Sequence, residues 1–180
     1  MVKNTLIFAA LLLLFTAGTA SAEGMYAGFK YRKIQGENLV FFRSNDDLDE
    51  SAATAGVLLG YSLISKHWVR LAVEAEFSKS IASGDFHNTP NNEWEIDTQT
   101  IYGVFTFGTK VYGKIKLGSS RNVLTRRVDG VTKKRDNSGP AAGIGIGYRF
   151  TPRLTAEIES TVDYGGKDFI GTSFGLNYHF

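Results

Sequence analysis

The sequence contains no cysteine, and this absence excludes disulfide bridges, thiolate metal sites and cysteine-based catalysis. Proline is scarce at 3 residues, and the net charge of +2 shows no excess of either sign. A balanced charge argues against nucleic acid as a partner. The chain is instead rich in glycine, phenylalanine and tyrosine, with 20, 13 and 8 residues. Aromatic residues suit a pleated surface and glycine occurs where strands bend or crowd, so we expect an all-β protein.

Long apolar runs are also missing. The apolar run from Leu6 to Phe15 follows Lys3 and is too short for a helix that must cross about 30 Å of hydrocarbon. Small residues follow this run and end at Ala22, which is typical of cleavage by signal peptidase. We therefore predict a signal peptide over residues 1–22 and one domain over residues 23–180. No later run is long enough for a transmembrane helix, so any crossing of a membrane must use strands.

Apolar residues recur at every second position in eight segments, which predicts eight strands with one apolar and one polar face. These segments cover approximately residues 25–32, 54–63, 69–78, 93–107, 111–117, 141–150, 154–163 and 170–180. Two facings are open for the segment 93–107. Either Ile101, Phe105 and Phe107 face outward, which we prefer, or Tyr102 and Val104 do.

The connections between these segments alternate in length. Long connections over residues 35–51, 79–92 and 119–139 are separated by short ones at residues 64–67 and 108–110. Outer-membrane barrels have this arrangement, with tight periplasmic turns and long extracellular loops. We therefore predict an eight-stranded antiparallel transmembrane β-barrel, whose even strand number places both ends in the periplasm.

The polar face decides between this barrel and a soluble barrel of the lipocalin type, because alternation alone fits both. It carries six basic and five acidic residues, namely Lys30, Arg32, Arg70, Lys114, Lys116 and Arg149 with Glu74, Glu76, Glu157, Glu159 and Asp163. Near-balance is typical of charges that pair across a narrow lumen, since an unpaired buried charge costs several kcal/mol. We predict a lumen filled by a charge network.

The opposite face is nearly free of Lys and Arg, which would cost about 2–4 kcal/mol each at the middle of a bilayer. Five aromatic residues are expected in girdles at the level of the lipid headgroups, namely Tyr31, Tyr61, Trp68, Trp94 and Tyr148.

The last residues of the chain carry apolar side chains at every second position and end in an aromatic residue, in the series Phe174, Leu176, Tyr178 and Phe180. This series resembles the carboxy-terminal signature by which outer-membrane barrels are recognised for insertion. Residues 24–180 resemble the small outer-membrane β-barrel family, the porin-like eight-stranded barrels of the OmpA/OmpX type. The resemblance implies the cell outer membrane as location and a monomer surrounded by lipid and lipopolysaccharide. It also implies the outer-membrane assembly machinery as a partner during insertion.

Catalytic patterns are missing. Lipid A deacylases place a serine two residues from a histidine, and no such pair occurs at any of the three histidines, His67, His87 and His179. The acidic residues of the first long connection lack the spacing of a calcium-binding loop. We therefore expect no enzymatic activity, no metal site and no cofactor.

The long connections differ in charge. The third has six basic residues against Asp129 and Asp136, a local charge of +4, from Arg121, Arg126, Arg127, Lys133, Lys134 and Arg135. Such a cluster suits lipopolysaccharide phosphates or an acidic surface ligand, although loop charge also serves only to solvate the rim. We expect a structural or surface-interaction role. A small solute channel and a lipid A-modifying enzyme are the alternatives.

Overall fold

The computed structural model describes residues 24–35, 52–85, 93–128, 131–164 and 168–180, so the predicted signal peptide lies outside them. Strands account for nearly all of this part of the chain. They are β1 (Met25–Gln35), β2 (Ala52–Lys66), β3 (Val69–Ala82), β4 (Gly84–Asp85), β5 (Glu93–Gly108), β6 (Val111–Val128), β7 (Val131–Arg149), β8 (Leu154–Tyr164) and β9 (Asp168–His179).

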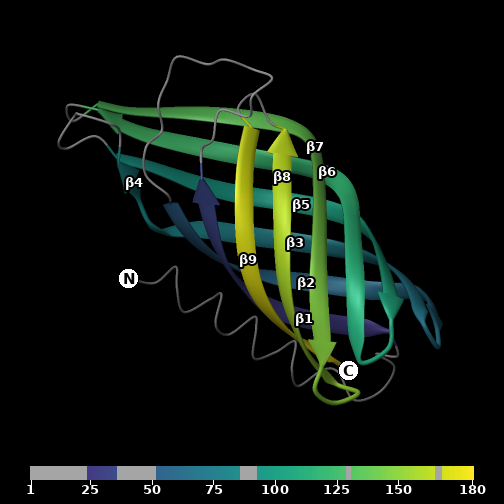
Figure 1. Ribbon diagram of the computed structural model, residues 1–180. Coiled ribbons are helices and arrows are strands. Elements are labelled where there is room, and N and C mark those ends of the chain that lie inside the picture. Colours follow the sequence, from purple (N-terminus) through teal and green to yellow (C-terminus); the bar gives the residue numbers. More distant parts are fainter. Residues whose placement is uncertain (1–23, 36–51, 86–92, 129–130, 165–167) are drawn as a thin grey trace.

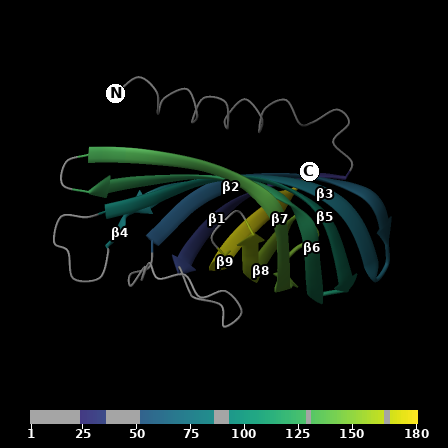
Figure 2. The same ribbon diagram turned by 90° about the horizontal axis from the view of Figure 1, so that it is seen from above.

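The strands form a closed antiparallel barrel. β1 pairs with both β2 and β9, and β3 pairs with β5, so eight long strands close on themselves. The two-residue strand β4 only attaches to the start of β5. Figure 1 shows β1 beside β9, and Figure 2 shows the strands curving around a common interior. The predicted eight-stranded antiparallel barrel is confirmed. Within the residues described, no helix is long and apolar enough to cross a membrane.

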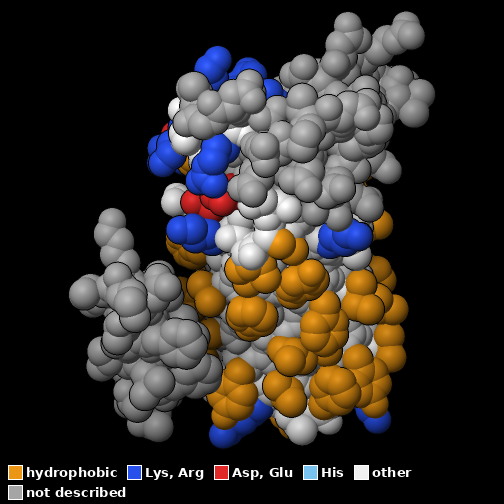
Figure 3. All heavy atoms as spheres, turned by 90° about the vertical axis from the view of Figure 1, so that its left-hand side faces the viewer, with side chains coloured by type: hydrophobic (Ala, Val, Ile, Leu, Met, Phe, Trp, Pro, Cys, Tyr) orange, Lys and Arg blue, Asp and Glu red, His pale blue; other side chains and the backbone are white. Residues whose placement is uncertain are grey.

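Burial alternates along the strands as the sequence pattern predicts. On β5, Ile101 is 64 % exposed whereas the next residue, Tyr102, is fully buried, so the preferred facing of this strand is confirmed. Phe29, Leu117 and Ile144 are likewise exposed on the outer face of β1, β6 and β7. Figure 3 shows hydrophobic side chains gathered in a broad band on the face of the barrel that it displays. The outer surface is therefore suited to lipid.

Tight turns connect the strands at one end of the barrel, which we call the turn end; the opposite end is the loop end. The turn after β5 needs Gly108, whose φ is +119° and whose Cβ, if present, would lie 2.5 Å from the carbonyl oxygen of Val111. The end of the chain lies here too, where the Phe180 N–H donates to the Met25 carbonyl oxygen at 3.1 Å.

The prediction of a long connecting loop over residues 119–139 is wrong. β6 continues to Val128 and β7 begins at Val131, so these residues form a β-hairpin whose strands stay paired, with Arg121 opposite Ser138. Apolar alternation stops where the strands leave the lipid-facing band, but their backbone pairing continues. The periodicity of the sequence reports the contact with lipid and not the backbone pairing. This β6–β7 hairpin reaches toward the upper left in Figure 1.

Candidate functional site

The middle of the lumen is occupied by a buried ion network centred on Lys114 of β6. Its Nζ lies 2.7 Å from Glu74 Oε1, 2.9 Å from Glu157 Oε2 and 2.8 Å from Glu159 Oε1. These glutamates come from β3 and β8, so the contacts cross the interior of the barrel. A single ammonium group is thus held by three carboxylates in a site shielded from water.

Two further lysines extend the network toward the loop end. Lys116 Nζ lies 2.6 Å from Glu76 Oε1 and 2.8 Å from Glu159 Oε2. Lys30 Nζ lies 2.6 Å from Glu76 Oε1 and also pairs with Glu159. The lysines and glutamates therefore form one connected cluster, which we call the lumen ion network.

A separate pair lies beside this cluster. Arg32 of β1 donates to Asp163 Oδ2 of β8 at 3.1 Å and also donates to the hydroxyl of Thr161. The structure thus places nine of the eleven predicted lumen charges in contact with an opposite charge, namely Lys30, Arg32, Glu74, Glu76, Lys114, Lys116, Glu157, Glu159 and Asp163. The other two, Arg70 and Arg149, lie closer to the turn end.

Tyr26 separates Arg70 from the lumen ion network. Its hydroxyl donates to Glu74 Oε1 at 2.8 Å, while the Arg70 guanidinium carbon lies 4.8 Å from the centre of its ring. The ring rests on Gly60 of β2, where an added Cβ would lie 2.1 Å from the ring carbon Cζ. Glycine is therefore required for the ring to lie against the barrel wall.

Tyr112 repeats this arrangement on β6. Its hydroxyl donates to Glu157 Oε1 at 2.7 Å, and the Arg149 guanidinium carbon lies 5.1 Å from the ring centre. An added Cβ at Gly147 would lie 2.2 Å from the Cζ of this ring. Tyr26 and Tyr112 together form a layer, the tyrosine layer, with carboxylates on one side and guanidinium groups on the other. Both tyrosines share the inward parity of the lumen lysines, but the layer itself was not predicted from the sequence.

Apolar side chains fill the lumen toward the loop end. A buried cluster on the inner wall consists of Ile34, Ala52, Trp94, Ile96 and Leu124. The prediction that Trp94 belongs to an aromatic girdle is wrong, because this side chain is fully buried. Its position two residues before Ile96, and thus on the inward face of β5, is the signal that could have placed it. The other predicted girdle residues are exposed, namely Tyr31, Tyr61, Trp68 and Tyr148.

The β6–β7 hairpin carries a different kind of charge cluster. Arg121 donates to Asp136 from Nε, at 3.0 and 3.1 Å, and from Nη2, at 2.5 Å. These hydrogen bonds hold the pKa of the Asp136 carboxyl below its ordinary value. Lys133, Lys134 and Arg135 are exposed on β7. On β6, Arg126 is half-buried and Arg127 exposed, whereas Asp129 lies outside the described residues.

The histidines offer no catalytic arrangement in the part of the chain that can be described. His67 is exposed at the turn after β2, and His179 is half-buried beside Arg70, whereas His87 lies outside the described residues. No group of three or more His, Cys, Asp and Glu side chains there could hold a metal ion. Of the predicted insertion signature, Phe174 and Leu176 are exposed on the outer face of β9, and Tyr178 and Phe180 are half-buried.

Comparison with known proteins gives the family and the fold. The family described as outer membrane protein beta-barrel domain matches residues 7–180. No curated protein matches the chain. Neisserial surface protein A has a similar structure, with a TM-score of 0.63, 16 % identity and coverage of 89 % of this chain and 99 % of that one.

Two further solved structures are similar. The N-terminal β-barrel domain of Pseudomonas aeruginosa OprF has a TM-score of 0.58 and 13 % identity, covering 89 % of this chain and 100 % of that one. Ail, the attachment invasion locus protein of Yersinia pestis, solved with the heparin analogue sucrose octasulfate, has a TM-score of 0.58 and 12 % identity. It covers 87 % of this chain and 96 % of that one. At these identities the likeness shows the fold alone.

Proposed function

This chain belongs to the outer membrane protein β-barrel family, and we propose that it acts at the cell surface through its β6–β7 hairpin rather than through its lumen. Its location is the outer membrane. Barrels in this membrane have short turns on the periplasmic side and long extensions outside. We therefore assign the turn end to the periplasm and the β6–β7 hairpin to the cell exterior.

The exposed basic residues of the hairpin carry the proposal. Lys133, Lys134 and Arg135 are consecutive on a strand, so their side chains project to both faces of the hairpin. Figure 3 shows Lys and Arg side chains gathered at the end of the barrel beyond the hydrophobic band. Such a cluster suits a polyanion, because guanidinium and ammonium groups bind sulfate, phosphate and carboxylate. Ail, which shares this fold, has been solved with the polyanion sucrose octasulfate. We propose an acidic polysaccharide as ligand.

The test exchanges Arg126, Arg127, Lys133, Lys134 and Arg135 for Gln and measures binding to heparin and to lipopolysaccharide at two salt concentrations. Weaker binding is expected, with the loss largest at low salt, because exposed charges are screened within about 8 Å at physiological ionic strength. Loss with lipopolysaccharide alone assigns the hairpin to the protein's own membrane and contradicts an external ligand. Unchanged binding of both polyanions removes the hairpin as a site.

A smaller pair of variants provides a matched control. Lys134→Gln with Arg135→Gln removes two charges from the hairpin, and Lys110→Gln with Arg153→Gln removes the same residue types from the turn end, where both are exposed. Only the hairpin pair is expected to weaken binding. Equal effects from the two pairs mean that total charge, not the hairpin, attracts the polyanion.

The lumen ion network argues against the channel alternative. Lys114 contacts carboxylates from β3 and β8, so ion pairs span the interior of the barrel. In the described part of the chain, the side-chain hydrogen-bond partner of His179 is Arg70 rather than a serine, which argues against the enzyme alternative. We propose a non-enzymatic role for which the barrel is a rigid support.

A further inference from the structure

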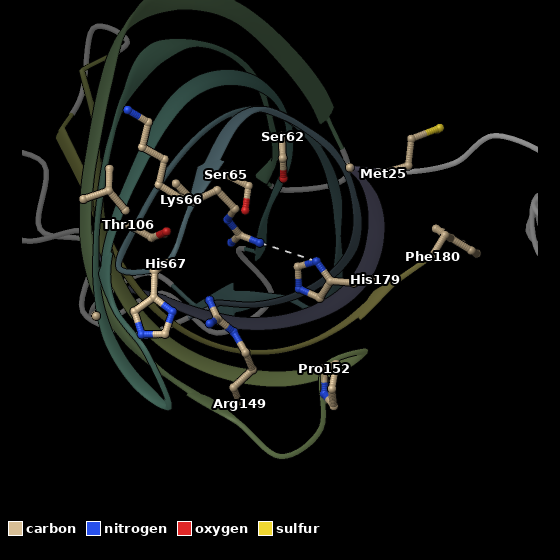
Figure 4. A pocket seen from close by; sticks show the side chains of 14 residues that line it. Met25, Ser62, Ser65, Lys66, His67, Thr106, Arg149, Pro152, His179 and Phe180 are labelled. Carbon is tan, nitrogen blue, oxygen red and sulfur yellow. Dashed lines mark hydrogen bonds between the residues drawn. The ribbon is translucent and has the colours of Figure 1, made fainter.

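The barrel opens at its turn end into a cavity of about 670 Å³, which we call the periplasmic vestibule. Among the described residues, its lining includes Lys66, Arg70, Arg149 and His179 but no Asp or Glu side chain. Figure 4 shows Arg149 and His179 pointing into this opening. The vestibule thus has an excess of positive charge.

Arg70 is the deepest cation of the vestibule and is only 7 % exposed. Within the described ranges no carboxylate lies within 4.0 Å of it, in contrast to Arg32 on the other side of the tyrosine layer. Its partners are the Tyr26 ring and His179 Nδ1, at 3.4 Å from Nη1, and its Nε has none among the residues described. A buried guanidinium group whose N–H donor has no partner is stabilised by binding an anion.

His179 adds a second open donor. Arginine has no acceptor, so the contact with Arg70 requires Nδ1 of His179 to accept the hydrogen bond and places the proton on Nε2. This Nε2 is buried and, in the described part of the chain, has no hydrogen-bond partner. The open groups of Arg70 and His179 are therefore both donors.

Arg149 completes the set from the opposite wall. It lines the same cavity, rests over the Tyr112 ring and has no described carboxylate within 4.0 Å. We propose that the periplasmic vestibule binds a small oxyanion, a phosphate or carboxylate group held between Arg70, Arg149 and His179. The planar guanidinium group matches both oxyanions in a bidentate manner. The tyrosine layer keeps this anion apart from Glu74 and Glu157, so it does not compete with the lumen ion network.

The experiment titrates the full chain, refolded in phosphatidylcholine nanodiscs, with inorganic phosphate and with succinate, and follows the heat by calorimetry. Saturable binding of at least one anion is expected. Arg70→Gln and Arg149→Gln should each weaken it by about tenfold or more, because each removes charge-assisted hydrogen bonds. Arg153→Gln, an exposed arginine at the same end that does not line the cavity, is the matched control and should bind like the parent.

Heat-modifiable gel mobility verifies that each variant is folded, and the half-buried Arg149 keeps the test decisive if Arg70→Gln does not fold. Repeating the titration with phosphatidylglycerol in the nanodisc identifies the source of the anion. Weaker apparent binding there assigns a lipid headgroup to the vestibule, and unchanged binding assigns a free periplasmic anion. The proposal is overturned if neither anion binds saturably, or if Arg149→Gln and Arg153→Gln bind equally well.

Discussion

Ion pairs of similar length occur in two regions of this molecule that differ in their access to water. In the lumen, the side chains of Lys114 and its three carboxylate partners are at most 1 % exposed. On the hairpin, those of Arg121 and Asp136 are 57 % and 47 % exposed. Water can replace a lost partner on the hairpin but not in the lumen. We therefore expect the loss of a lumen partner to destabilise the barrel far more than the loss of a hairpin partner.

The largest effect is expected for Lys114→Met, which leaves three buried carboxylates without their shared cation. Breaking a buried ion pair from one side costs about 3–5 kcal/mol, and we expect a loss of that order in the free energy of unfolding. Urea unfolding in lipid vesicles measures it. Lys133→Met, the same exchange at an exposed hairpin position, is the control and should leave stability nearly unchanged. Equal losses of stability at Lys114 and Lys133 would contradict the expected difference between the lumen and the hairpin.

Smaller losses are expected when the tyrosine layer is displaced. Gly60→Ala and Gly147→Ala each add a methyl group that overlaps a tyrosine ring, that of Tyr26 and that of Tyr112 respectively. Overpacking of this kind costs about 1–3 kcal/mol of stability. Gly103→Ala is the matched control, since its Cβ would have its nearest contact at 3.7 Å. Unfolding experiments in lipid should rank the control as the mildest of these variants. A Gly103→Ala loss as large as the other two would contradict the assignment of this cost to the tyrosine rings.

The smallest effect on stability is expected for Arg121→Gln on the hairpin. The substitution should instead raise the pKa of Asp136, because the hydrogen bonds that hold this pKa below its ordinary value are lost. In the parent, the pair contributes at pH values above the ordinary aspartate pKa and is lost as the pH falls through the lowered value. Carboxyl carbon NMR should show the Asp136 midpoint rising in the variant. A midpoint that does not change would contradict the bidentate contact.

Strand number, order and facing follow from the sequence because a barrel wall separates two environments. Period-2 alternation predicts two faces wherever lipid lies outside and a packed lumen inside, but for residues 93–107 it left two facings open, and the burial of Tyr102 confirms the preferred one. The alternation also predicts the inward position of Lys114 and the glutamates. It also places Trp94 inward, two residues before Ile96, but an aromatic side chain near a strand end suits a girdle as well, and this explains the wrong prediction.

Contacts across the lumen depend on closure and register, which one strand's pattern does not contain. Arg70 and Lys114 both read as inward-facing bases, yet only Lys114 meets carboxylates, because the Tyr26 ring lies between Arg70 and Glu74. The β6–β7 hairpin could not be predicted from the sequence for a related reason. From Ser119 onward the inward residues Ser120, Asn122 and Leu124 stay buried, but the outward face has left the lipid, so strand pairing there leaves no outward apolar repeat.

The central claim is that buried ion pairs close the lumen, so the barrel acts through its exterior. Planar bilayer recording of the refolded protein tests this claim most directly. We predict no stable porin-sized conductance, because an interior just wide enough for side chains is already occupied by Lys114, Lys116 and their carboxylate partners. A steady conductance of porin size in the parent protein would contradict the claim and favour a solute channel.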